Sequence, residues 1–140
     1  ATLPGAHYNL GRLLEASGDR DGAVGAYQRT LALESNYAPA LQNLGLLLAE
    51  RGQVIPALEH LRQLVALQPE RAKAHGCLAF ASMKAGDVDG ALASYQEVAR
   101  LQPDDAEAHE YVCRLLEHRG DDAALRAEQA RWLALGKRRR

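Results

Sequence analysis

Four glycines recur at a fixed interval of 34 residues in this chain of 140 residues. They are Gly18, Gly52, Gly86 and Gly120. An apolar position keeps the same step and is occupied by Leu10, Leu44, Leu78 and Val112. A constant period of this length is typical of one supersecondary unit stacked several times, because a single unit cannot bury its own apolar face. Such stacks form long concave surfaces that hold other proteins, and they rarely enclose catalytic clefts.

Within each unit, apolar residues recur every three or four positions, which is typical of a helix with one buried face. The first such stripe of the second unit consists of Ala40, Leu41, Leu44, Leu47 and Leu48. A second stripe starts at Val54 and ends at Pro69, because proline cannot continue the helical hydrogen-bond ladder. The third unit predicts helices near 72–85 and 88–101. The short connections make neighbouring helices antiparallel, so we expect eight helices in four hairpins.

Two helix starts carry local signals. Asp19 or Asp21 can cap the second helix of the first unit through a side-chain oxygen. Pro39 falls in the opening turn of the next helix, where its missing N–H costs nothing.

Composition excludes several classes of function. A net charge of −1 argues against general binding to a polyanion. The two cysteines form neither a disulfide framework nor a paired metal motif. No apolar run approaches the roughly 20 residues that span a bilayer, and no nucleophile with a positioned histidine or phosphate-binding loop appears. We therefore expect no enzyme activity, cofactor, metal or small-molecule substrate. The expected location is cytoplasmic, with periplasmic or membrane-tethered locations left open because the chain starts without methionine.

The repeated unit resembles the tetratricopeptide repeat (TPR) family. Its Leu-Gly pair is Leu10-Gly11 in the first unit and Leu44-Gly45 in the second. The small residue of the second helix is Ala23, Ala57 and Ala91, and the bulky residue after it is Tyr27, Leu61 and Tyr95. The resemblance implies an all-α fold, a right-handed superhelical α-solenoid of four antiparallel hairpins. The implied boundaries are 4–37, 38–71, 72–105 and a degenerate fourth repeat at 106–137, followed by a basic tail at 138–140.

The fourth repeat departs from the family pattern. Cys113 and Leu125 stand where glycine and alanine are usual, and Gln129 occupies the bulky position. We interpret 122–135 as a cap-like helix with a polar face, because a terminal repeat must shield the stacking surface from water. The polar face is expected to carry Arg126, Glu128, Gln129 and Arg131. The residues expected to hold the helix are Leu125, Trp132, Leu133 and Leu135.

In the family the first helix of each hairpin lines the concave groove, and the resemblance carries this role to the matching positions. The residues expected to contact a partner are Tyr8, Asn9, Arg12, Gln42, Asn43, Leu46, Lys73, Cys77, Phe80, Met83, Tyr111 and Arg114. Leu46, Phe80 and Met83 form an expected exposed apolar patch, which commonly marks a binding site. Asn43 and Leu46 are expected to face solvent.

Asn9 and Asn43 resemble the asparagine row with which O-linked N-acetylglucosamine transferases grip extended peptides. Either they contact a peptide backbone, since an amide offers a donor and an acceptor, or they merely face water. The carboxylate clamp of chaperone-binding members is matched only by Asn43 and Lys73, so we do not expect a chaperone clamp.

His7, His75 and His109 share one position in successive repeats, yet neighbouring hairpins lie too far apart for a shared metal. His109 and Cys113 would form half of a site that no carboxylate completes. We therefore expect these histidines to pack at half-buried seams of the stack instead of binding a metal. Cys113 is expected to be a buried thiol, and Cys77 the more reactive one in the groove.

The sequence predicts a protein-interaction scaffold that binds a peptide or helix of a partner protein in its groove. Two alternatives remain: the substrate-recognition arm of a larger enzyme such as an O-linked glycosyltransferase, or a self-assembling adaptor. The basic run from Lys137 to Arg140 is read as a solvated helix end, with no nucleic-acid binding and no membrane insertion expected.

Overall fold

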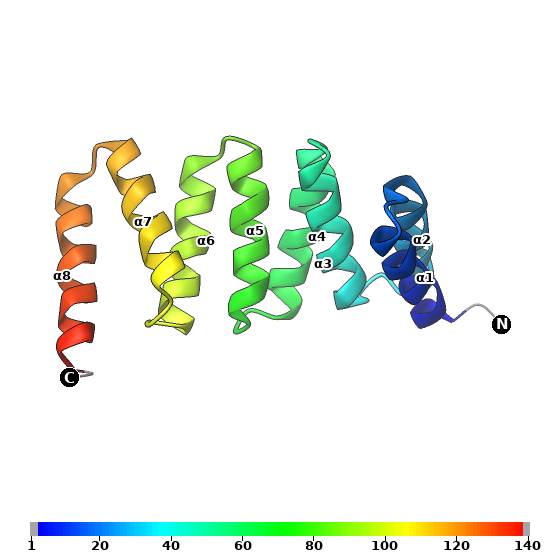
Figure 1. The fold of residues 1–140 in the computed structure, drawn as a ribbon, viewed down its shortest axis with the longest axis horizontal. Coiled ribbons are helices and arrows are strands. Elements are labelled where there is room, and N and C mark those ends of the chain that lie inside the picture. Colours follow the sequence, from blue (N-terminus) through cyan, green and yellow to red (C-terminus); the bar gives the residue numbers. More distant parts are fainter. Residues whose placement is uncertain (1–2, 139–140) are drawn as a thin grey trace.

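The computed structural model describes residues 3–138, and every regular element in that range is a helix. The eight helices are α1 (Pro4–Ala16), α2 (Arg20–Leu33), α3 (Ala38–Glu50), α4 (Val54–Leu67), α5 (Ala72–Lys84), α6 (Val88–Leu101), α7 (Ala106–Arg119) and α8 (Asp122–Arg138). They form a row of antiparallel hairpins running from one end of the molecule to the other (Figure 1). The α-solenoid of four hairpins expected from the sequence is confirmed.

The recurring glycines end the first helix of each hairpin. Gly18, Gly52, Gly86 and Gly120 are the four described residues with positive φ, between 72° and 89°. Other residues pay a steric cost in this left-handed conformation, whereas glycine adopts it freely. Asp19, and not Asp21, caps the second helix of the first hairpin by accepting a hydrogen bond from the Gly22 N–H. Pro39 lies in the first turn of α3, as expected.

Glycine inside the first helices has a different purpose, which is close packing within a hairpin. A Cβ placed on Gly45 would lie 2.5 Å from Cγ of Leu61, and one on Gly11 would lie 2.5 Å from Cε1 of Tyr27. Tyr27 and Leu61 could not keep their positions if these glycines carried a Cβ. A bulky side chain on α2 or α4 therefore packs directly against a glycine on α1 or α3.

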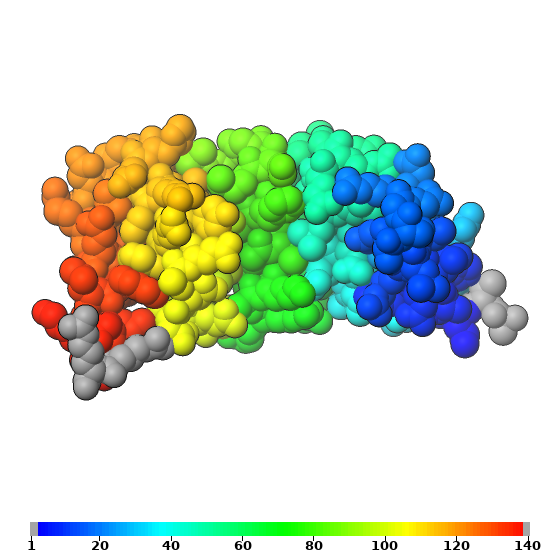
Figure 2. All heavy atoms as spheres, viewed as in Figure 1, coloured from blue at the N-terminus to red at the C-terminus, as the bar shows by residue number. Residues whose placement is uncertain are grey.

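The core runs through the first three hairpins. Its largest fully buried side chains include Tyr27, Leu41, Leu44, Leu47, Leu61 and Leu64. All of them belong to one cluster, and the atoms of neighbouring hairpins meet along the face that Figure 2 shows. A separate, smaller cluster joins α6 to α7 and the first half of α8 through residues such as Leu92, Val112 and Leu116.

The last helix is only partly the cap predicted from the sequence. Arg126, Gln129 and Arg131 are exposed as expected, but Glu128 is 6% exposed and faces the interior. Leu133, expected to hold the helix, is 65% exposed, so Leu125, Trp132 and Leu135 provide the partly buried contacts. Of the expected basic tail, Arg138 is the last residue of α8, and 139–140 lie outside the described residues.

Candidate functional site

A pocket of about 370 Å³ opens between α3, α5, α6 and α7. Five residues predicted to contact a partner line it, namely Leu46, Lys73, Cys77, Phe80 and Tyr111. The other lining residues are Ala72, Gly76, Tyr95, Val98, Gln102, Asp105, Glu107 and Ala108. We call this set the groove pocket. Its walls are mainly apolar or aromatic, while Lys73 and Glu107 place opposite charges at exposed positions of α5 and α7.

One wall of the groove pocket is a pair of stacked tyrosines. The rings of Tyr95 and Tyr111 are nearly parallel, at 6°, with centroids 4.5 Å apart. Burial raises the pKa of Tyr95 to about 12, with smaller contributions from Tyr111 and Glu107. Sequence reasoning missed Tyr95 as a site residue because its repeat position indicates a bulky core side chain, and the groove was assigned to the first helices alone.

A second, shallower pocket of about 280 Å³ lies toward the N-terminal end of the stack. It is lined by Arg12, Glu15, Ala16, Tyr27 and Asn43, two of which were predicted to contact a partner. Its floor is a polar network. The Tyr27 hydroxyl donates to Oε1 of Glu15 at 2.9 Å. The pKa of Tyr27 is raised to about 12, mainly because the phenol is buried.

Asn43 and Leu46, both expected to face solvent, are only partly exposed, and each lines one of the two pockets. Asn43 is half-buried. Its amide nitrogen donates to the Tyr8 hydroxyl at 3.2 Å and to the Tyr27 hydroxyl at 3.4 Å. Leu46 and Phe80 are also half-buried and pack against the main core. The Asn43 donors therefore serve the internal network, and only Asn9 of the two-residue row is exposed.

The remaining predicted contacts lie outside both pockets. They are Tyr8, Asn9, Gln42, Met83 and Arg114. Met83 is 42% exposed, so the apolar patch is divided between the groove pocket and the open surface. Arg114 pairs with Glu110 one turn earlier on α7, and the guanidinium of Arg12 lies 5.9 Å from the centre of the Tyr8 ring.

The burial of the two cysteines is the reverse of that expected, although Cys77 does line the groove pocket. Cys77 is 6% exposed and belongs to the main core, and burial raises its pKa despite the nearby Lys73 and Arg71. Cys113 is the more exposed thiol, with Sγ 3.6 Å from Nε2 of His109. Burial, followed by Glu128 and Glu117, raises its pKa as well. Both shifts favour the neutral thiol over the thiolate, which is the reactive form.

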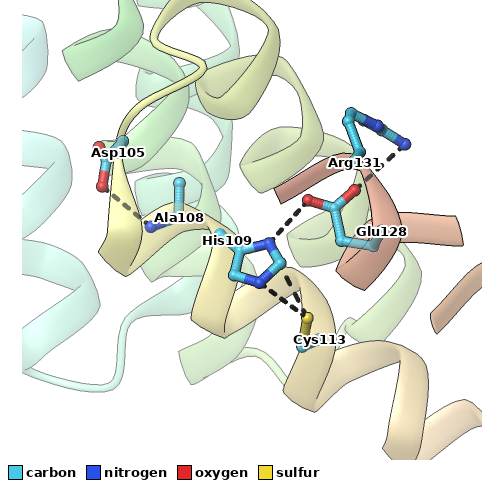
Figure 3. Close-up of polar contacts among 6 residues, drawn as sticks. All are labelled: Asp105, Ala108, His109, Cys113, Glu128 and Arg131. Carbon is cyan, nitrogen blue, oxygen red and sulfur yellow. Dashed lines mark hydrogen bonds and ion pairs between the residues drawn. The ribbon is translucent and has the colours of Figure 1, made fainter. Parts of the chain in front are cut away.

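His75 packs at the seam between two hairpins, whereas His109 contacts α8 of its own hairpin and has a partner that sequence reasoning excluded. Nε2 of His75 lies 2.7 Å from the Pro69 carbonyl oxygen. Nδ1 of His109 lies 3.0 Å from Oε1 of Glu128, so a carboxylate does join His109 and Cys113 (Figure 3). The two residues lie on different helices and 19 positions apart, which gives no short-range sequence signal. Among residues 3–138, no group of three or more histidine, cysteine or acidic side chains has a geometry that could hold a metal.

Two models of tetratricopeptide repeats match the sequence, one over residues 6–37 and the other over residues 48–115. The chain belongs to the tetratricopeptide repeat family. No curated protein matches the sequence. None of the helices in the described range is long and apolar enough to cross a membrane.

Solved TPR structures superpose on most of the chain. MamA from Desulfovibrio magneticus RS-1, residues 41 to the end, is 23% identical with a TM-score of 0.81, over 96% of this chain and 76% of that one. The first TPR domain of Spaghetti (RPAP3), bound to an HSP90 peptide, is 17% identical with a TM-score of 0.77, over 84% and 93%. A mutant O-GlcNAc transferase of Thermobaculum terrenum is 30% identical with a TM-score of 0.70, over 81% of this chain but 22% of that protein. The shared fold is the helical solenoid of tetratricopeptide repeats.

The two phenols with raised pKa values predict a loss of stability at alkaline pH. The pKa values of Tyr27 and Tyr95 are raised from 10.0 to about 12 in the folded chain, so folding favours their neutral forms. Their contribution is complete below pH 10 and is lost as the pH rises toward 12, because the unfolded chain ionises first. We expect the free energy of unfolding to fall by about 1 to 3 kcal/mol over this range, since one pKa unit corresponds to about 1.4 kcal/mol.

Urea denaturation at several pH values measures this loss. The matched variant is Tyr27→Phe together with Tyr95→Phe, which removes both ionising groups and keeps the rings. Its free energy of unfolding is expected to depend less steeply on pH between 10 and 12, and an equal slope would contradict the assignment.

Proposed function

We propose that this chain binds an extended segment of a partner protein along the face formed by α3, α5 and α7. The observation that carries the proposal is the groove pocket, a hollow of about 370 Å³ with apolar walls on the first helices of successive hairpins. An apolar concavity with a few polar groups at its edge is the usual form of a recognition site.

The pocket chemistry supports an apolar anchor on the partner. Leu46 and Phe80 supply aliphatic and aromatic surface from neighbouring hairpins, and the stacked Tyr95 and Tyr111 form a flat wall. Lys73 suits an acidic residue on one side of the anchor, and Glu107 suits a basic residue on the other side. Charges at the edge of such a site mainly determine orientation and specificity.

Charge reversal at the pocket edge tests the proposal. The Lys73→Glu variant is compared with Arg62→Glu, which reverses an exposed charge on α4, outside the groove pocket. Wild type and Arg62→Glu are expected to retain the same partner protein from a lysate of the source cells, and Lys73→Glu is expected to retain at least tenfold less. Quantitative mass spectrometry measures the ratio. Equal retention by all three proteins would place the interface elsewhere.

The second candidate is a substrate-recognition arm of a larger enzyme. It is favoured by the 30% identity to the O-GlcNAc transferase, of which this chain would correspond to 22%. The internal hydrogen bonds of Asn43 weigh against a peptide-gripping asparagine row. The complete reading frame distinguishes the two candidates, because an arm requires a catalytic domain in the same polypeptide.

A third candidate is self-assembly of copies of this chain. It predicts concentration-dependent oligomers in light scattering that vanish when 121–140 is deleted.

A further inference from the structure

A third cavity, of about 230 Å³, lies between α6, α7 and α8 and shares no residue with the two pockets described above. We call it the seam pocket. It is lined by Ala99, Pro103, His109, Glu128, Arg131, Trp132, Ala134, Leu135 and Arg138. The His109 and Trp132 rings stack at 4.6 Å between centroids, so one wall is aromatic. Alanine, proline and leucine side chains form most of the rest.

The equivalent position one repeat earlier is occupied by different contacts and smaller side chains. His75 is the counterpart of His109 one repeat earlier, and it is buried against the Pro69 carbonyl. The counterparts of Glu128 and Trp132 are Ser94 and Val98, which are smaller and buried. In the last repeat the histidine bonds Glu128 instead (Figure 3). A cavity remains beside this pair.

The charge at this seam is also reversed between repeats. Arg131 and Arg138 replace the acidic residues Glu97 and Asp104 of the preceding repeat. Glu128 is 6% exposed and has two partners, because Oε1 faces His109 at 3.0 Å and Oε2 faces Arg131 at 3.2 Å. Within residues 3–138, Arg138 has no ion-pair partner. The pocket therefore combines apolar walls with an excess of positive charge.

We propose that the seam pocket binds the C-terminal residue of a partner polypeptide when that residue is apolar. Roughly 150 Å³ of apolar cavity can hold benzene, so a leucine or phenylalanine side chain fits beside Trp132, Pro103 and Leu135. The terminal carboxylate then lies at Arg138 and at the exposed donors of Arg131. Guanidinium groups bind carboxylates through paired, charge-assisted hydrogen bonds, which explains two arginines at the edge of an apolar pocket.

Trp132 reports occupancy directly, because it is the single tryptophan of the chain. The probe is the acetylated peptide Gly-Ser-Gly-Leu with a free carboxyl end, and the matched control is the same peptide with a C-terminal amide. We expect the free acid to change tryptophan emission saturably and the amide to bind at least tenfold more weakly. No saturable change, or equal binding of acid and amide, would overturn the proposal without any variant being made.

Two variants then test the arginine contact. Arg138→Gln removes the cation at the pocket edge, whereas Arg126→Gln removes an exposed cation of α8 that does not line the pocket. We expect at least tenfold weaker binding of the free acid by Arg138→Gln and unchanged binding by Arg126→Gln. Circular dichroism checks that both variants keep their helices. Full binding by a folded Arg138→Gln would overturn the proposed site.

Discussion

The Leu44→Ala variant is expected to lose about 2 to 5 kcal/mol of the free energy of unfolding, the usual range for a buried leucine cut to alanine. Leu44 has no exposed surface and belongs to the main core that joins the first three hairpins. Removing its side chain leaves a cavity between helices that cannot close without moving a whole hairpin. Because neighbouring repeats stabilise one another, the loss weakens the stack on both sides. Urea denaturation followed by circular dichroism measures it.

The matched control is Leu13→Ala, which makes the same truncation on α1, where the side chain is 69% exposed. Its expected cost is below about 0.5 kcal/mol, as for other surface substitutions. If both variants lose the same free energy, the core assignment is wrong, because the difference between them depends only on burial.

The His109→Ala variant is expected to destabilise the docking of α8 by about 1 to 3 kcal/mol, the range for taking a hydrogen-bond partner from a buried polar group. It removes one of two partners of the buried Glu128 and leaves Arg131. It also removes the ring on which Trp132 stacks. Hydrogen exchange in α8 should quicken selectively, and tryptophan emission should shift to longer wavelength as Trp132 meets water.

A second substitution separates the charge from the packing. Adding Glu128→Leu to His109→Ala removes the buried carboxylate, so part of the lost protection in α8 is expected to return. His118→Ala, an exposed histidine of the same helix, serves as the control and should behave like the wild type. If the amides of α8 exchange faster in the double variant than in His109→Ala alone, the contact between His109 and Glu128 is not what holds α8.

The candidate site was predictable in outline and not in detail. Position within the repeat correctly assigned Leu46, Lys73, Phe80 and Tyr111 to a shared surface, since helical spacing fixes the direction of each side chain. It failed for Asn43, whose donors point to two tyrosines on other helices. Cys77 lines the same surface, but its side chain is far less exposed than its position on the helix predicts.

The sequence by itself determined the stack. Glycines that require positive φ recur every 34 residues, and Gly11 and Gly45 leave room for one bulky partner each, so the ends and the packing of the hairpins follow from local chemistry. The tertiary structure decided which side chains of one helix meet those of its neighbours. Glu128 contacts His109 because α8 packs against α7 in the last hairpin, and the Asn43 amide contacts tyrosines on α1 and α2 of the preceding hairpin. The face of a helix on which a side chain lies depends on spacing along the chain, whereas contacts between helices depend on the volumes of all the side chains packed between them.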